Sequence, residues 1–276
     1  MLHVCPTPIG NLGDITTRVL ETLRKVDVIA SEDTRRTGRL LAHFAIDKPQ
    51  LSFFEHNEVR RVPEIIGMLR EGRDVALVSD AGMPGICDPG YRLIAAALDA
   101  GLPVQVLPGP SALDTALVAS GFPTDSFVFL GYIPRKRSER EQMLRMIAAE
   151  SRTCVAYEVP HRLAATLAAA PDIIGDRRLA VCRELTKKFE EVDRGTAAEL
   201  AARLPEKVRG ELVIVFAPDE KAAPSGNWDG EELAEAIRDL LAAGISPRVA
   251  AGIASRLSGI PRNRAYSLAL ELRKEG

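Results

Sequence analysis

The feature that most constrains the architecture is one stretch, ALVSDAGMPGICDPG, residues 76–90. An apolar run stops at Ser79-Asp80, and the eleven residues from Asp80 to Gly90 hold three Gly, two Pro and two Asp. A buried strand that ends in so rigid and bare a loop is typical of the carboxyl edge of a parallel sheet, where ligands bind. The stretch therefore predicts an α/β fold with a ligand site at this edge.

Strand and helix patterns alternate on both sides of this stretch. The predicted strands of the first half cover 2–8, 26–31, 51–55, 75–80 and 104–107. Between these strands, apolar residues recur with the spacing of a helix, which predicts helices over 17–25, 35–44, 59–70, 91–100 and 111–119. Strands that alternate with helices of this length indicate a mainly parallel sheet with helices on both faces.

A break near 127–133 begins a second pattern. We expect strands over 127–133, 153–158, 179–183 and 211–216, and helices over 138–149, 161–169 and 196–203. The segment 219–230 has the composition of a linker, and the residues after it look wholly helical, with Ser246-Pro247 as an N-cap and first helical residue. The predicted domains are an N-terminal α/β domain over 1–125, a second α/β domain over 126–220, and a C-terminal helical basic domain over 231–276.

Composition limits the class of protein. The 276 residues are about right for two medium domains, and 46% apolar and 27% charged residues are ordinary for a soluble protein. A net charge of −2 gives no global sign of a nucleic-acid or membrane partner. The N-terminus reads as a first strand rather than a signal peptide, and no apolar run approaches the length of a membrane span. We expect a cytoplasmic protein with no membrane contact.

The cysteines and histidines are scattered. Cys5, Cys87, Cys154 and Cys182 are far apart and form no paired motif. Free thiols in a reducing cytosol are favoured over disulfides. We assign no metal site, because no cluster with the spacing of metal ligands is present.

Three loops at predicted strand ends are rich in Gly and Pro: TPIGNLGD (7–14), SDAGMPGICDPG (79–90) and PGPSA (108–112). Glycine lets a ligand approach the backbone, and each loop leads into a helix whose first N–H groups can bind it. The motifs GxGxxG, GxxxxGK and GxSxG are absent, which argues against a Rossmann dinucleotide site, a P-loop and a nucleophile elbow. A bare cleft of this kind suits a reaction in which a cofactor supplies the reactive group.

Eight motifs together resemble the tetrapyrrole methylase superfamily and, within it, the branch that methylates small-subunit ribosomal RNA. In chain order they are TPIGNLGDIT, SEDTRRT, EHNE, ALVSDAGMPGICDPGYRL, LPGPSA, YEVPHRL, CRELTKKFEE and RGELVIV. The resemblance covers about residues 3–276. It implies two α/β domains with an interdomain cleft, S-adenosyl-L-methionine as cofactor, and a homodimer. It also implies 2′-O-methylation of a cytidine ribose in the decoding region of 16S ribosomal RNA. The chain departs from the pattern at Met83, where Thr is usual, and at Val159, where Ser is usual.

The resemblance also implies which loops hold the cofactor. The residues concerned are Pro8, Ile9, Gly10, Asp80, Ala81, Gly82, Met83, Pro84, Ser111, Ala112, Tyr157, Gly210 and Glu211. Asp80 can receive the cationic amino group of the cofactor, although a helix or turn cap is its alternative role. Ala81 and Ala112 leave room for adenine, and Met83 can line a pocket but cannot donate a hydroxyl hydrogen bond. We expect Asp88-Pro89-Gly90 to cap the next helix.

Polar clusters at predicted strand ends supply candidates for the reaction and for substrate binding. They are Glu32, Asp33 and Arg35; His56 and Asn57; Glu158, His161 and Arg162; and Arg183, Glu184 and Lys187. A ribose hydroxyl is a poor nucleophile, so alignment and a base help it react. Glu158 and Asp33 are the predicted proton-handling residues. Each cluster pairs acids with bases, so structural ion pairs are the alternative.

RNA binding requires a local basic surface. The run PRKRSER (134–140) supplies Arg135, Lys136 and Arg137, and the helix–turn–helix pattern near the C-terminus supplies Arg248, Arg262 and Arg264. With few aromatic residues, we expect recognition by shape and phosphate contacts. Two other functions stay open: a methyltransferase of the same fold that acts on a tetrapyrrole, and a non-catalytic ribosome assembly factor. The basic C-terminal segment argues against the first, and the three bare loops argue against the second.

Overall fold

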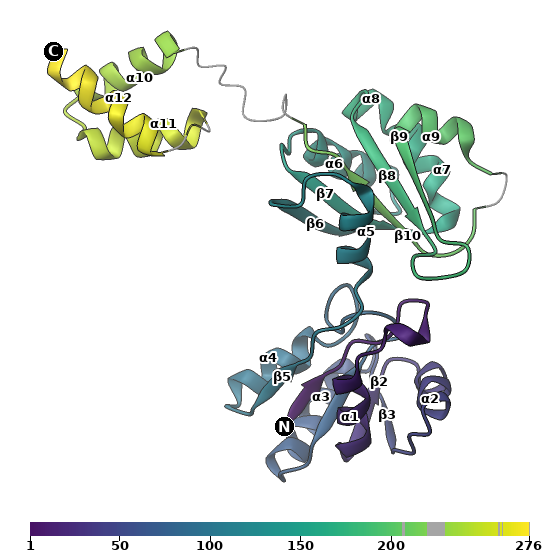
Figure 1. Ribbon diagram of the computed structural model, residues 1–276. Coiled ribbons are helices and arrows are strands. Elements are labelled where there is room, and N and C mark those ends of the chain that lie inside the picture. Colours follow the sequence, from purple (N-terminus) through teal and green to yellow (C-terminus); the bar gives the residue numbers. More distant parts are fainter. Residues whose placement is uncertain (206–207, 220–229, 259, 261, 276) are drawn as a thin grey trace.

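The computed structural model describes residues 1–205, 208–219, 230–258, 260 and 262–275 (Figure 1). Its first sheet has the order β3-β2-β4-β1-β5, and every neighbouring pair is parallel. The strands are β1 (Leu2–Val4), β2 (Val28–Ser31), β3 (Gln50–Ser52), β4 (Val75–Val78) and β5 (Val104–Val106). The predicted parallel sheet is confirmed. Strand β2 ends at Ser31 as expected. Strands β1, β3 and β4 end two to four residues earlier than expected, and β5 ends one residue earlier.

Helices cover both faces of this sheet. They are α1 (Thr17–Lys25), α2 (Thr34–His43), α3 (Glu58–Arg70) and α4 (Tyr91–Asp99), with a short 3₁₀ turn, η1 (Leu12–Asp14). Leu23 of α1 and Leu41 of α2 pack in one buried cluster, whereas Ile65 of α3 and Leu93 of α4 pack in another. The caps are local: the Thr16 hydroxyl accepts a hydrogen bond from the Val19 N–H at the start of α1.

The second sheet is mixed. Its order is β6-β7-β10-β8-β9, in which only β6 and β7 are parallel. The strands are β6 (Phe127–Tyr132), β7 (Thr153–Glu158), β8 (Arg178–Arg183), β9 (Glu191–Thr196) and β10 (Leu212–Phe216). Strand β9 was not predicted, because EVDRGT is polar and lies at the sheet edge, where only Gly195 is buried.

Helices also cover both faces of the second sheet. One face carries α6 (Arg137–Ala148), α7 (Pro160–Ala169), α8 (Pro171–Ile174) and α9 (Ala197–Arg203), whose apolar residues form one cluster with the sheet. The other face carries α5 (Ala112–Ser120), which lies before the predicted boundary at residue 125. Leu113 and Leu117 of α5 pack with Val213 of β10 and with Ile9 from the loop after β1. This cluster therefore joins the second sheet to a loop of the first.

Three C-terminal helices form a unit of their own (Figure 1). They are α10 (Gly230–Ala242), α11 (Pro247–Ser258) and α12 (Arg262–Glu275), packed around Leu233, Ile237, Ala254 and Ala265. The predicted start of α11 at Pro247 is correct. Most of the predicted linker, residues 220–229, lies outside the described residues.

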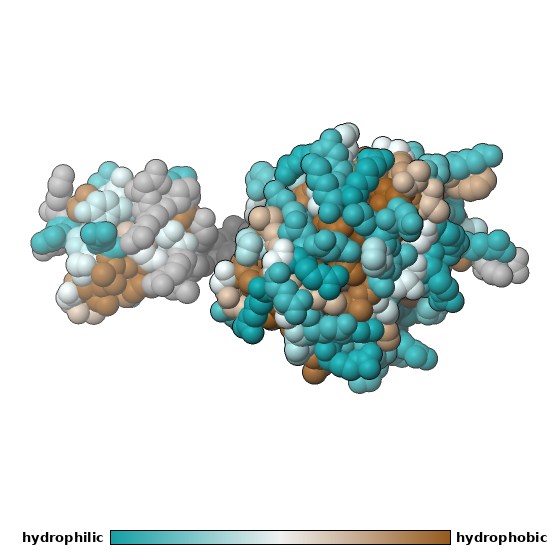
Figure 2. All heavy atoms as spheres, turned by 90° about the horizontal axis from the view of Figure 1, so that it is seen from below, coloured by the Kyte–Doolittle hydropathy of each residue, from teal (hydrophilic) through white to brown (hydrophobic). Residues whose placement is uncertain are grey.

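Hydrophilic side chains cover most of the face of the two-sheet part that Figure 2 shows. In the part of the chain that the structure describes, no helix is long and apolar enough to cross a membrane.

Candidate active site

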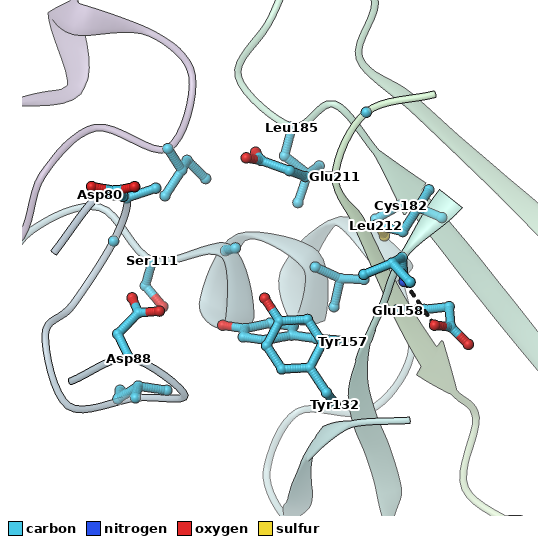
Figure 3. Close-up of a pocket in the computed structure, with 18 of the residues that line it drawn as sticks. Asp80, Asp88, Ser111, Tyr132, Tyr157, Glu158, Cys182, Leu185, Glu211 and Leu212 are labelled. Atoms are coloured by element: carbon cyan, nitrogen blue, oxygen red, sulfur yellow. Dashed lines mark hydrogen bonds between the residues drawn. The ribbon is translucent and has the colours of Figure 1, made fainter. Parts of the chain in front are cut away.

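A cavity of about 280 Å³ lies between the loops of the first sheet and the strand ends of the second (Figure 3). Its volume is close to the lower end of the range of small-molecule sites. Ten of the thirteen predicted cofactor residues line it: Ile9, Asp80, Ala81, Gly82, Met83, Ser111, Ala112, Tyr157, Gly210 and Glu211. Pro8, Gly10 and Pro84 are not among the lining residues. The three loops singled out by their Gly and Pro content therefore meet at one site.

Two backbone hydrogen bonds join the first two loops. Thr7 and Gly82 exchange N–H···O bonds, both of 2.9 Å, and the Thr7 hydroxyl donates to the Ser79 carbonyl at 3.0 Å. Gly82 has a φ of +78°, a left-handed conformation that favours glycine. These hydrogen bonds fix Ala81 and Gly82 at the cavity wall, where their small side chains leave space for a ligand.

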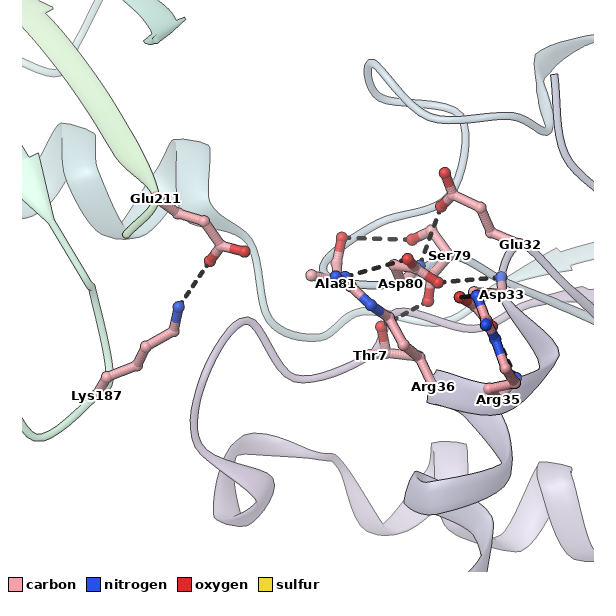
Figure 4. Close-up of polar contacts among 10 residues, drawn as sticks. All are labelled: Thr7, Glu32, Asp33, Arg35, Arg36, Ser79, Asp80, Ala81, Lys187 and Glu211. Atoms are coloured by element: carbon pink, nitrogen blue, oxygen red, sulfur yellow. Dashed lines mark hydrogen bonds and ion pairs between the residues drawn. The ribbon is translucent and has the colours of Figure 1, made fainter. Parts of the chain in front are cut away.

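Asp80 is tied to the start of α2 (Figure 4). One carboxylate oxygen accepts the Asp33 N–H at 3.1 Å, and the other lies 3.1 Å from the Arg36 guanidinium. The Asp80 N–H donates to Glu32 at 3.1 Å. Asp80 thus fixes the start of α2 and also lines the cavity. Because Glu32, Asp80, Asp88 and Glu211 all line the cavity, it suits a cationic ligand such as the sulfonium and ammonium groups of S-adenosylmethionine.

The segment Asp88-Pro89-Gly90 supplies the N-cap of α4 as expected, but the cap is Gly90 and no side chain, Asp88 included, makes a cap hydrogen bond. The Gly90 N–H donates to the buried Glu58 carboxylate at 3.2 Å. Asp88 instead points into the cavity (Figure 3). Burial raises the pKa of Asp88 to about 7, and the negative charges of Glu32 and Asp80 add to the rise, while a hydrogen bond from Ser79 opposes it.

Glu158 has a structural role at the end of β7. Its side chain is 0% exposed, and it accepts hydrogen bonds from the Val159 N–H at 2.7 Å and the Thr166 hydroxyl at 2.5 Å. Arg162 pairs with it at 3.2 Å. The carboxylate turns away from the centre of the cavity (Figure 3). These contacts hold the start of α7 on the sheet and engage both carboxylate oxygens of Glu158, although the residue is one of those that line the cavity.

Asp33 is the N-cap of α2 and lies outside the cavity lining. Its side chain accepts the Arg35 N–H at 2.8 Å and pairs with the Arg35 guanidinium at 2.9 Å. Hydrogen bonds from Arg35 lower the pKa of Asp33 to about 2, which makes it a weak base at neutral pH. For both residues predicted to handle the proton, the structure favours the alternative of a structural ion pair.

Four other residues predicted to bind substrate do not line the cavity: His56, Asn57, His161 and Arg183. Asn57 holds its own loop, since its amide bonds the Phe54 N–H and the Ser52 carbonyl, and His56 beside it is exposed. His161 is exposed, and Arg183 pairs with Glu191 across two strands.

Lys187 forms ion pairs with two carboxylates at the cavity rim. It lies 2.9 Å from Glu184 and 3.0 Å from Glu211, and Figure 4 shows the pair with Glu211. A Cβ on Gly10 would overlap the Lys187 and Thr186 side chains, so a larger residue there would displace them from this rim.

Several cavity residues were not predicted. They are Arg36, Ile86, Asp88, Tyr132, Val159, Pro160, Cys182, Leu185, Leu212 and Val213; Glu32, expected at the substrate, also lines the cavity. Most are apolar residues at strand ends of the second sheet, where sequence alone does not say which face is inside. Tyr132 could have been found, because it ends a strand and precedes a Pro-containing turn. Its ring lies 5.3 Å from that of Tyr157.

The predicted basic residues are exposed. Arg135, Lys136 and Arg137 precede or begin α6, where Lys136 pairs with Glu139 and Arg137 with Glu141. Arg248 of α11 and Arg264 of α12 are exposed, whereas the side chain of Arg262 lies outside the described residues. Helices α11 and α12 carry six basic residues against two acidic ones, and α10 carries one against four, so the basic character belongs to the last two helices alone.

Comparisons with known proteins agree with this architecture. The family model described as Tetrapyrrole (Corrin/Porphyrin) Methylases matches residues 1–201, and the RsmI C-terminal HTH domain matches residues 229–273. The chain is 44% identical to the ribosomal RNA small subunit methyltransferase I of Synechocystis over 100% of this chain and 99% of that protein. It is 42% identical to the protein of the same name from Escherichia coli O157:H7, over 98% of this chain and 94% of that one.

Solved structures show the same fold at low identity. The methyltransferase CobJ matches with a TM-score of 0.60 and 21% identity, over 79% of this chain and 93% of that one. Uroporphyrin-III C-methyltransferase from Thermus thermophilus, complexed with S-adenyl homocysteine, matches with a TM-score of 0.55 and 16% identity, over 78% and 96%. The chain belongs to the tetrapyrrole methylase family and, within it, to the ribosomal RNA small subunit methyltransferase I proteins.

Proposed function

We propose that this protein uses S-adenosylmethionine to methylate the ribose 2′ hydroxyl of a cytidine in the decoding region of 16S ribosomal RNA. The observation that carries the proposal is the full-length identity of 44% to a small-subunit ribosomal RNA methyltransferase, together with a cavity lined by the loops expected to bind the cofactor. The cofactor supplies an electrophilic methyl group when it is bound.

The chain's own residues would bind and orient that cofactor. Ala81 and Gly82 line the cavity, and two backbone hydrogen bonds between Thr7 and Gly82 hold their loop in place. Asp80 and Glu32 provide negative charge on one side, and apolar residues such as Leu185 and Val213 line the other. An apolar wall excludes water, which strengthens the attraction between a carboxylate and a cationic ligand. The residues therefore fit the cofactor, and Met83 lines the cavity as a thioether without a hydrogen bond to give.

The basic helices would bind RNA. Arg248 and Arg264 are exposed on α11 and α12, and Arg135 is exposed before α6. Phosphate contacts of this kind add affinity that falls as salt rises. We propose that these surfaces hold the small subunit while a ribose enters the cavity, and that the enzyme works in the cytoplasm, where its substrate is made.

We also propose a homodimer. Helix α4 and the edge strand β5 expose Tyr91 at 74%, Leu98 at 59% and Val106 at 56%. An edge strand with neighbouring exposed apolar side chains is a natural surface for a second copy. Sedimentation equilibrium tests this directly: a monomer at tens of micromolar concentration would refute the dimer without affecting the proposed activity.

The activity is tested by offering three substrates with methyl-labelled S-adenosylmethionine: purified small subunits, naked 16S RNA and a porphyrinogen. Label in ribosomal RNA supports the proposal. Transfer to the porphyrinogen alone would favour the tetrapyrrole reaction, and no transfer to any substrate, with cofactor binding intact, would favour a non-catalytic assembly factor.

A further inference from the structure

Five carboxylates line the cavity, and four of them already have close partners. Asp80 pairs with Arg36, Glu158 with Arg162, and Glu211 with Lys187, while Glu32 accepts the Asp80 N–H. Asp88 is the fifth. It accepts a hydrogen bond from Ser79, but it has no ion pair among the residues that the structure describes.

Asp88 is also the carboxylate placed opposite the aromatic side of the cavity. Figure 3 shows its carboxylate on the same side of the cavity as Ser111, across the open space from the rings of Tyr132 and Tyr157. Tyr132 is 50% exposed, so part of its ring is accessible to a ligand from outside. Aromatic rings of this kind commonly stack unpaired bases of RNA. A nucleotide stacked there would bring its ribose close to Asp88.

The loop 80–90 therefore presents two chemical groups to one space. Its first half, Asp80–Met83, lines the cavity where the cofactor is expected, and Asp88 lies at its second half. We propose that Asp88 is a catalytic residue that accepts the proton of the attacking ribose hydroxyl, an inference that rests on the proposed function. The 2′ oxygen forms a bond to the methyl carbon while the bond from that carbon to sulfur breaks. The sulfur keeps the electron pair, and the hydroxyl proton passes to an Asp88 oxygen.

The electrostatic surroundings suit this role. The titratable groups that act on Asp88, or on which it acts, are Glu32, Asp80, Cys87, Tyr132 and Tyr157. Burial comes first and the repulsion from Glu32 second among the causes that raise the pKa of Asp88 to about 7. A base is most effective when its pKa lies near the working pH, because it is then both ionised and basic. By contrast, the pKa of Asp33 is about 2 and its partner is Arg35.

The test measures methyl transfer to small subunits across pH 5.5 to 9, together with cofactor affinity by calorimetry. For the wild type, kcat/KM should rise through a single ionisation near pH 7, because only ionised Asp88 accepts a proton. Asp88→Asn should lower kcat about 100-fold or more and abolish this rise, while cofactor affinity changes less than about threefold. Asp99→Asn, the same exchange at an exposed site of α4, is the matched control and should behave as the wild type.

If Asp88→Asn also loses cofactor binding, a second variant tests whether the ionisation in the pH profile belongs to Asp88. Glu32→Gln removes the largest charge repulsion on Asp88, so it should move the ionisation to lower pH. A profile that is flat in the wild type, or one that Glu32→Gln does not move, would overturn the role of Asp88, as would full activity of Asp88→Asn. Failure of the wild type to methylate any small subunit would instead refute the proposed function.

Discussion

Because Glu158 forms a buried ion pair with Arg162 at the end of β7, we expect it to stabilise the fold rather than to accept the proton in the reaction. Glu158→Ala would leave Arg162, whose side chain is only 18% exposed, without its partner, and would remove the acceptor for the Thr166 hydroxyl and the Val159 N–H. Loss of one partner of a buried ion pair costs about 3–5 kcal/mol. Because Arg162 keeps some access to water, we expect Glu158→Ala to lower the free energy of unfolding by about 3 kcal/mol, near the lower end of this range.

Urea unfolding followed by circular dichroism measures this loss, provided that the dependence on urea keeps its slope. Glu139→Ala is the matched control, since it breaks the exposed pair with Lys136 and should cost less than about 1 kcal/mol. The double variant Glu158→Met/Arg162→Met should recover part of the stability, because no unpaired charge remains. A loss below about 1 kcal/mol, combined with a methyl-transfer rate that no longer depends on pH, would refute the structural role and restore Glu158 as the base.

Three further predictions concern ligand binding. Gly210→Ala should destabilise the fold by about 1–3 kcal/mol and weaken cofactor binding by calorimetry, because φ is +92° and a Cβ would overlap Glu184; unchanged affinity would contradict the place of Gly210 at the cavity. Asp80→Asn should weaken cofactor binding about tenfold, since it removes a charge from the cavity but keeps an acceptor for the Asp33 N–H; an affinity within twofold of the wild type would exclude a direct role. A chain that ends at residue 219 should keep cofactor affinity and lose most of its salt-dependent RNA binding in filter assays, and RNA affinity that survives would place the RNA surface elsewhere.

The first sheet was predictable because its strands are apolar and its loops are rich in Gly and Pro. Both signals are local, and they follow directly from burial and backbone conformation. Strand β9 was missed because an edge strand pairs on one side only and tolerates polar residues, so EVDRGT carries no apolar alternation. The packing of α5 on the second sheet was also missed, since it depends on contacts between segments far apart in sequence.

In the site, as in the fold, features set by local sequence could be predicted, whereas features set by tertiary contacts could not. The loops that line the cavity could be predicted from composition, because their high Gly and Pro content is visible in the sequence. The roles of single carboxylates could not be predicted in this way. Glu158 is the last residue of β7, and Asp88 lies in the loop after β4. Glu158 contacts Arg162 and Thr166, whereas Asp88 faces the cavity. Which way each points depends on tertiary partners that sequence spacing does not specify.

Nucleoside mass spectrometry identifies the RNA atom to which the protein transfers the methyl group. Small subunits that lack the modification are incubated with the purified protein and labelled S-adenosylmethionine, and the RNA is then digested to nucleosides and sequenced fragments. We expect label on the ribose 2′ oxygen of a cytidine in the decoding region. Label on a base, on another ribose, or on no nucleotide of the RNA would contradict it.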